Sequence, residues 1–302
     1  MARLSIFLLG GVAIEVDGCG PLRFPTRKSK SLLAFLVLGS DRSYDRSTLA
    51  GQLWPDVDND RAQRSLNTEL WRLRSMLNSI DLKPATFLHS CSESIGFRRD
   101  SDHWVDAGEF HAMTDLSASH HPEFLSDLSR AVALYRGDLA EGVVDEWCLV
   151  QREKFRARLI AALDYLLARA MDAKHWQAAI GFGRRLLDLD PLQEHVYRAL
   201  MHCQFNAGNR TGALKLYAAC KKILHDELQI EPMDETRETY EAIASSQRHR
   251  LRIGPVDSHV APHCQVQDLL GKIETALGQI AHAQAVLEDA STQLMKLSKA
   301  PR

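Results

Sequence analysis

The chain has 302 residues and a formal net charge of −2, with 45% hydrophobic and 25% charged residues. These values are ordinary for a globular protein long enough for two domains, and a charge of −2 spread evenly would argue against nucleic-acid binding. No run of 18 apolar residues occurs, so no membrane-spanning helix is predicted. The chain begins with a strand pattern rather than a signal peptide, which indicates a cytoplasmic protein.

The six cysteines, at positions 19, 91, 148, 203, 220 and 264, have no metal-ligand spacing among them. They are scattered through expected strands and helices, which is typical of a reduced protein with small buried thiols. His259 and His263, beside Cys264, have a ligand-like spacing but no evident fourth partner. We therefore expect no metal and no cofactor.

The N-terminal residues predict a small sheet. Apolar side chains alternate with period two over residues 4–16, which indicates two short strands bent at Gly10 and Gly11. Leu22–Phe24 is a candidate third strand, ending before Pro25.

Two helices are expected next. Thr26 can cap a helix rich in leucine that ends at Gly39. Ser43–Asp45 is expected to be a turn. A second helix, Arg46–Trp54, follows it and ends before Pro55, because proline cannot continue a helix.

The helix expected over residues 58–78 has two contrasting faces. Asp58, Asn59 or Asp60 can cap its first turn. Residues 61–78 contain four Arg and one Glu, so basic charge is concentrated here although the whole chain is slightly acidic. At roughly 100° per residue, one face is an apolar stripe suited to burial: Ala62, Leu66, Leu70, Leu73 and Leu77.

The opposite face and its flanks carry groups that suit DNA phosphates and base edges. These residues are Arg61, Arg64, Asn67, Thr68, Trp71, Arg72, Arg74 and Ser75. Arg72 is the candidate for two parallel hydrogen bonds to a guanine, and Arg64 for a phosphate contact. The alternative for the whole helix is an ordinary amphipathic helix with a solvated basic face. The alternative for Trp71 alone is packing against the loop between the second and third helices. Glu69 would place a negative charge beside the phosphates.

A hairpin is expected after this helix. Thr86–His89 and Ser94–Arg99 form its strands, with a turn through residues 91–93. Arg98 and Arg99 would lie on the returning strand, where Arg98 is a second candidate phosphate contact. Strands, three helices and then a basic hairpin is the order of a winged helix preceded by a small sheet.

The motifs SLLAFLVL, STLAGQLWPD and RAQRSLNTELWRLRSML resemble the OmpR-type winged helix of bacterial transcription regulators. The motifs LWPD, RAQRSL and LWRLR more closely resemble those of bacterial transcriptional activators of the SARP class. The resemblance implies that the third helix enters the major groove of DNA, with Arg64, Thr68, Trp71, Arg72 and Arg74 facing it. It also implies that Arg98 and Arg99 belong to the wing.

From Asp106 onward the pattern is helical. Leu166 and Leu200, Ala173 and Ala207, Ala179 and Ala213, and Ile180 and Leu214 are each 34 residues apart, which is the tetratricopeptide period. Such an array commonly binds proteins, and the alternative is a stacked core that only holds the chain together. The expected helices are Glu123–Tyr135, Asp145–Asp172, His175–Leu189, Glu194–Ala207 and Thr211–Leu228.

This half resembles the bacterial transcriptional activation domain that accompanies the winged helix in that family. The resemblance rests on the motifs ALYRGDLAEG, DEWCLVQREKFRARL, AIGFGRRLLDLDPLQEHVYRALM and ALKLYAACKKILHDELQIEPMDETRETYEAI. In larger members a P-loop ATPase follows, but no GxxxxGK[ST] occurs here. No GxSxG, HExxH or paired-carboxylate motif is found either, so we expect no enzyme.

Residues 247–263 read as a linker, and residues 264–302 as a C-terminal helix. A seam of apolar residues alternates at spacings of four and three, which favours a coiled coil over a helix docked on the repeats. It consists of Val266, Leu270, Ile273, Leu277, Ile280, Leu287 and Leu294.

The sequence thus predicts a multidomain, mainly α protein. A winged-helix DNA-binding domain with a small sheet and wing hairpin spans residues 1–105, and a TPR-like bacterial transcriptional activation domain spans 106–246. We expect a sequence-specific regulator, an activator, that binds double-stranded DNA. Its repeats would serve homodimerisation or contact with RNA polymerase. The alternative is a helical-repeat adaptor whose winged helix contacts protein.

Overall fold

The computed structural model describes residues 4–16, 20–40, 42–79, 83–115 and 123–245. The chain begins with β1 (Leu4–Phe7) and β2 (Ala13–Val16), which pair antiparallel as the alternating pattern predicts. On its other edge β1 pairs parallel with β6 (His103–Val105), so the strand order is β2–β1–β6. The expected linker and C-terminal helix lie outside the described residues.

Each of the next helices begins at a side-chain cap. Thr26 caps α1 (Arg27–Leu38) by accepting a hydrogen bond from the Ser29 amide, and Gly39 follows the helix, as expected. Asp45 caps α2 (Arg46–Leu53) by accepting from the amides of Ser47 and Thr48. These caps satisfy backbone donors that have no partner within a helix. α3 (Asn59–Asn78) packs against both α1 and α2.

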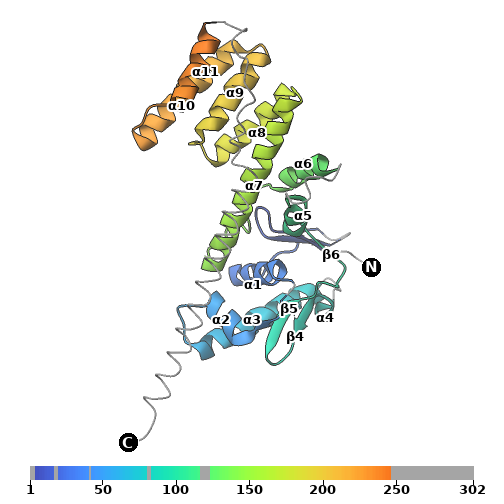
Figure 1. Ribbon diagram of the computed structural model, residues 1–302. Helices are drawn as coiled ribbons and strands as arrows, with labels where there is room; N and C mark the ends of the chain where they lie inside the picture. Colours follow the sequence, from blue (N-terminus) through green and yellow to red (C-terminus); the bar gives the residue numbers. More distant parts are fainter. Residues whose placement is uncertain (1–3, 17–19, 41, 80–82, 116–122, 246–302) are drawn as a thin grey trace, which may run out of the picture.

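A second sheet has the order β3–β5–β4 and lies beside α3 (Figure 1). α4 (Pro84–Phe87) leads into β4 (Leu88–Ser90), which forms a hairpin with β5 (Ser94–Phe97). β3 (Tyr44–Asp45) pairs with the other edge of β5. The expected hairpin is therefore present, with shorter strands than predicted.

Of the remaining helices, α5 lies beside β6, and α7–α11 extend away from the two sheets (Figure 1). The 27-residue α7 runs from the level of α1 to α8, and α8–α11 stack beyond it. Ala179 and Ala213 are both fully buried, and Ala173 and Ala207 both follow the ends of helices. The bounds are α5 (Asp106–Met113), α6 (Phe124–Leu134), α7 (Glu146–Asp172), α8 (Trp176–Leu189), α9 (Glu194–Asn206), α10 (Arg210–Leu228) and α11 (Asp234–Ala244).

The two halves of the chain share one core, because a continuous cluster of buried side chains runs from Leu4 to Cys203. The Ala140 amide donates to the Leu8 carbonyl at 2.6 Å, and the Gly10 amide to the Asp138 carbonyl at 3.0 Å. Gly10 has φ +109°, a conformation that residues with a side chain rarely adopt. The loop between β1 and β2 is thus bonded to the segment before α7.

Several local predictions are wrong. Leu22–Phe24 is not a strand: the Leu22 amide donates to the Ile14 carbonyl, and Pro25 follows without a backbone donor. The turn expected at Ser43–Asp45 contains β3, because Tyr44 and Asp45 find a partner in β5. Thr86 lies in α4 rather than in a strand. The sequence pattern does not predict β6, α5 or α11 as separate elements.

The cysteine prediction holds for Cys148, Cys203 and Cys220, which are buried. Burial raises the pKa of the Cys203 and Cys220 thiols to about 12, so both are protonated at neutral pH. Cys91 is exposed in the turn of the β4–β5 hairpin, contrary to the expectation of buried thiols. A turn residue beyond the last strand pair has nothing to cover it.

Candidate nucleic-acid interface

α3 buries the stripe of Ala62, Leu66, Leu70, Leu73 and Leu77, as its periodicity predicts. The Asp58 carboxylate caps the helix by accepting from the Arg61 amide at 2.9 Å. Burying these apolar side chains against α1 and α2 fixes the rotation of α3 about its axis, since the stripe can face the core in only one way. The opposite face is therefore held outward.

On that outward face, Arg61, Arg64, Asn67, Thr68 and Trp71 are exposed. The Trp71 side chain is 67% exposed, so the alternative in which it packs against the preceding loop is wrong. The indole is therefore a large apolar surface among the polar side chains of the outward face. The remaining predicted residues of this helix are half-buried: Arg72, Arg74 and Ser75.

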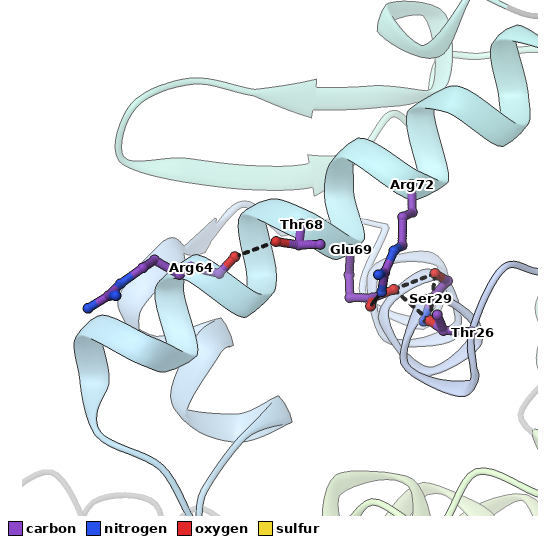
Figure 2. A network of polar contacts seen from close by, with 6 residues as sticks. All are labelled: Thr26, Ser29, Arg64, Thr68, Glu69 and Arg72. Carbon is purple, nitrogen blue, oxygen red and sulfur yellow. Dashed lines mark hydrogen bonds and ion pairs between the residues drawn. The ribbon is translucent and has the colours of Figure 1, made fainter.

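Glu69 does not lie on the outward face of α3, so the expectation of a negative charge on that face is wrong. It is 6% exposed and points toward α1 (Figure 2). Thr26 and Ser29 donate their hydroxyls to Oε2, each at 2.6 Å, and Arg72 Nη1 donates to Oε1 at 2.5 Å. Burial opposes ionisation of this carboxyl, but the hydrogen bonds from Ser29, Thr26 and Arg72 together lower its pKa. The negative charge is thus enclosed and compensated.

The same network determines where Arg72 points. Its guanidinium extends along α3 toward Glu69 and α1, as Figure 2 shows. A bidentate contact from Arg72 to guanine would have to break or share this ion pair. Arg64, in contrast, points away from the network, and its Nε donates to the Asp60 carbonyl at 3.3 Å.

Arg46 is a residue of this surface that sequence reasoning missed. Its guanidinium donates to Asn67 Oδ1 on α3 and, through Nη1, to Ser90 Oγ at 3.1 Å and to the Cys91 carbonyl at 3.2 Å. One side chain on α2 therefore joins the outward face of α3 to the hairpin. An arginine in the first turn of a helix gives no signal of this role, because its partners are 21 or more residues away.

Arg98 and Arg99 follow β5 instead of lying on it, so their placement on the returning strand is wrong. The Arg98 amide donates to the Phe87 carbonyl at 2.7 Å, at the end of the hairpin opposite its turn. Both side chains are exposed. The part of the hairpin that Arg46 joins to α3 is the turn end, at Ser90 and Cys91.

Across the described ranges, no three His, Cys, Asp or Glu side chains gather as a metal site would require. The helices in the described part of the chain include none with both the length and the apolar character needed to cross a bilayer.

Residues 105–244 match the family model of the bacterial transcriptional activator domain. The chain is 27% identical over 260 residues to the transcriptional regulatory protein EmbR of Mycobacterium tuberculosis, covering 81% of this chain and 64% of EmbR. It is 26% identical over 249 residues to the regulatory protein AfsR of Streptomyces coelicolor, covering 80% of this chain and 24% of AfsR. It therefore spans less than two thirds of either relative.

The solved structure of Mycobacterium tuberculosis EmbR in complex with a low-affinity phosphopeptide has the same fold. The TM-score is 0.61 at 21% sequence identity, covering 82% of this chain and 66% of that one. The match confirms a mainly α fold with small sheets. The family model and the relatives confirm the resemblance to SARP-class transcriptional activators.

Proposed function

We propose that this protein is a sequence-specific DNA-binding transcriptional regulator, an activator, in which α1–α3 and the β4–β5 hairpin act as a winged helix. The observation that carries the proposal is the outward face of α3, where Arg61, Arg64, Asn67, Thr68 and Trp71 stand exposed above a buried leucine stripe. The major groove of B-DNA accepts a helix of this kind, and these side chains can contact phosphates and base edges.

The anchoring of the hairpin supports this proposal. Because Arg46 bonds both Asn67 and the hairpin, α3 and the wing would approach DNA as one preformed surface. A preformed surface loses less conformational freedom on binding than one that must be ordered. Arg98 and Arg99, at the other end of the hairpin, would extend the contact along the phosphate backbone.

The test is direct binding of the full chain to duplex DNA, with sites selected from a random pool. The affinity should fall steeply as salt rises, because each neutralised phosphate releases counterions. Arg64→Ala should weaken binding to all sequences alike and reduce the salt slope by about one. Arg184→Ala is the matched control, since Arg184 is an exposed arginine on α8, in the other half of the chain. Equal loss in both variants would contradict the proposed interface.

We infer further that α7–α10 form TPR-like helix pairs that contact RNA polymerase or a second copy of the chain. The equivalent burial of Ala179 and Ala213, one period apart, supports this inference. Light scattering and binding to purified RNA polymerase test it. If the full chain selects no DNA but binds a protein partner through these helices, the adaptor alternative replaces the proposed function.

A further inference from the structure

The centre of the outward face of α3 carries the Trp71 indole and the Thr68 methyl group beside the polar Asn67, although the ends of this face are basic. Trp71 lies one turn after Thr68, and residues three apart on a helix are neighbours. The Thr68 hydroxyl donates to the Arg64 carbonyl at 3.0 Å (Figure 2). Because its hydrogen is already bonded within the helix, Thr68 offers a ligand its methyl group and an acceptor oxygen, but no donor.

The basic groups nearest to this apolar centre are directed elsewhere. Arg72 is ion-paired with Glu69, which Thr26 and Ser29 hold against α1. Removing Arg72 from Glu69 would leave an enclosed carboxylate without its cation, which is unfavourable. Arg64 is directed toward the N-terminal end of α3, where it bonds the Asp60 carbonyl. The Arg46 guanidinium lies at Asn67 but is bonded to that side chain and to the hairpin. The middle of the helix therefore presents the Trp71 indole and the Thr68 methyl group, with no guanidinium of α3 directed across them.

We propose that Trp71 and Thr68 read the C5-methyl group of thymine, so that the preferred DNA has thymine at the base pairs facing the middle of α3. This inference rests on the proposed function and deepens it. Thymine carries the only methyl group on the unmodified major-groove edges, and apolar side chains distinguish it by contact. Burying one methyl group against the indole corresponds to about a fourfold gain in affinity.

The experiment replaces thymines by deoxyuridine, one at a time, in a site that the full chain selects from a random pool. This change removes the methyl group and leaves every hydrogen-bonding group of the base in place. Affinity is measured by fluorescence anisotropy. Wild type should lose about fourfold at one or two positions. Trp71→Ala should bind thymine and deoxyuridine equally at the position that Trp71 reads, whereas Trp71→Phe should keep part of the preference.

Arg64→Ala is the matched control, because it changes the same outward face of α3 and should weaken all sequences alike, which leaves the ratio of thymine to deoxyuridine affinity intact. Thermal melts should show that Trp71→Ala remains folded, since the side chain is exposed. Specific binding without any deoxyuridine effect would overturn the inference and leave the proposed function standing. The inference would also be overturned if Trp71→Ala weakened binding to all sequences alike, which would indicate a sugar contact. It would be overturned equally if Trp71→Ala left the DNA affinity unchanged, which would indicate a residue that binds protein. Selection of no DNA at all would overturn both.

Discussion

The Glu69 carboxylate accepts hydrogen bonds from Thr26, Ser29 and Arg72, so its charge stabilises the packing of α3 on α1. The hydrogen bonds to the charged form outweigh the effect of burial and lower the pKa of this group below its ordinary value of 4.5. A carboxyl with a lowered pKa stabilises the folded state above its unfolded pKa. That contribution is lost as pH falls through the folded pKa.

Glu69→Gln should therefore lower the free energy of unfolding at neutral pH by about 1–3 kcal/mol, because hydrogen bonds to a charged group are replaced by weaker ones. The difference from wild type should narrow as the pH is lowered below the ordinary pKa. Urea denaturation at a series of pH values measures it. A difference that stays constant into the acid range would mean that the charge of Glu69 contributes nothing. Asp127→Asn, at an exposed ion pair, is the control.

The outward face of α3 could be predicted at the residue scale, because a periodicity of 3.6 determines which side chains face the core. The buried position of the Glu69 side chain and its hydrogen bonds could not be predicted, since its partners at the start of α1 are 40 and 43 residues away. The role of Arg46 depends in the same way on distant partners. Periodicity shows on which face of a helix a side chain lies, but not which hydrogen bonds the side chain makes.

At the scale of elements, the close approach of α8 and α9 depends on Gly183. A Cβ atom at this position would lie 2.6 Å from Cδ2 and 2.9 Å from Cγ of Leu200, which is itself buried. Gly183→Ala should thus overpack the interface and lower the free energy of unfolding by about 1–3 kcal/mol. Chemical denaturation followed by helical circular dichroism measures this change.

Gly181 on the same helix provides the matched control, because a Cβ atom there meets nothing within 4 Å. Gly181→Ala should raise the free energy of unfolding by about 0.5–1 kcal/mol, since alanine is the better helix former. Equal effects of the two substitutions would show that helix propensity alone decides, and that α8 and α9 do not approach closely.

These helices could be predicted because the amphipathic pattern is visible within a short window of sequence and the 34-residue period is visible along the chain. The expected helices between residues 123 and 228 agree with α6–α10 to within a residue at each end. β3 and β6 have two and three residues, too few for a local pattern, and they exist because β5 and β1 lie beside them. Such strands depend on tertiary pairing, which no short window of sequence contains.

At the scale of the whole molecule, the two halves are joined by polar contacts as well as by a shared core. Lys28 on α1 donates to the Leu53 carbonyl at the end of α2 and to Asp145 before α7, each at 2.5 Å. Ser31 donates to the same carboxylate at 2.5 Å. The Phe35 ring meets Trp147 of α7 edge-on, with 5.0 Å between centroids. A movement of α7 would therefore displace the helices that support α3.

Asp106 is the most buried of the acidic residues that join the two halves of the chain. It is buried, and its two carboxylate oxygens accept hydrogen bonds from the amides of Leu8, Leu9 and Ala107. A chain cut after Val105 would lose these acceptors together with the pairing of Leu8 and Gly10 to the segment before α7. Residues 1–105 should for this reason be much less stable alone than within the chain.

In the full chain, Asp106→Asn should lower the free energy of unfolding by about 1–3 kcal/mol, because the amide nitrogen cannot accept from a backbone N–H. Since the core is continuous, the variant should shift one cooperative transition rather than separate two. Calorimetry, with tryptophan fluorescence and helical circular dichroism as independent probes, tests this expectation. Two separate unfolding transitions of the wild-type protein, one for the N-terminal sheet and another for α7, would contradict the shared core.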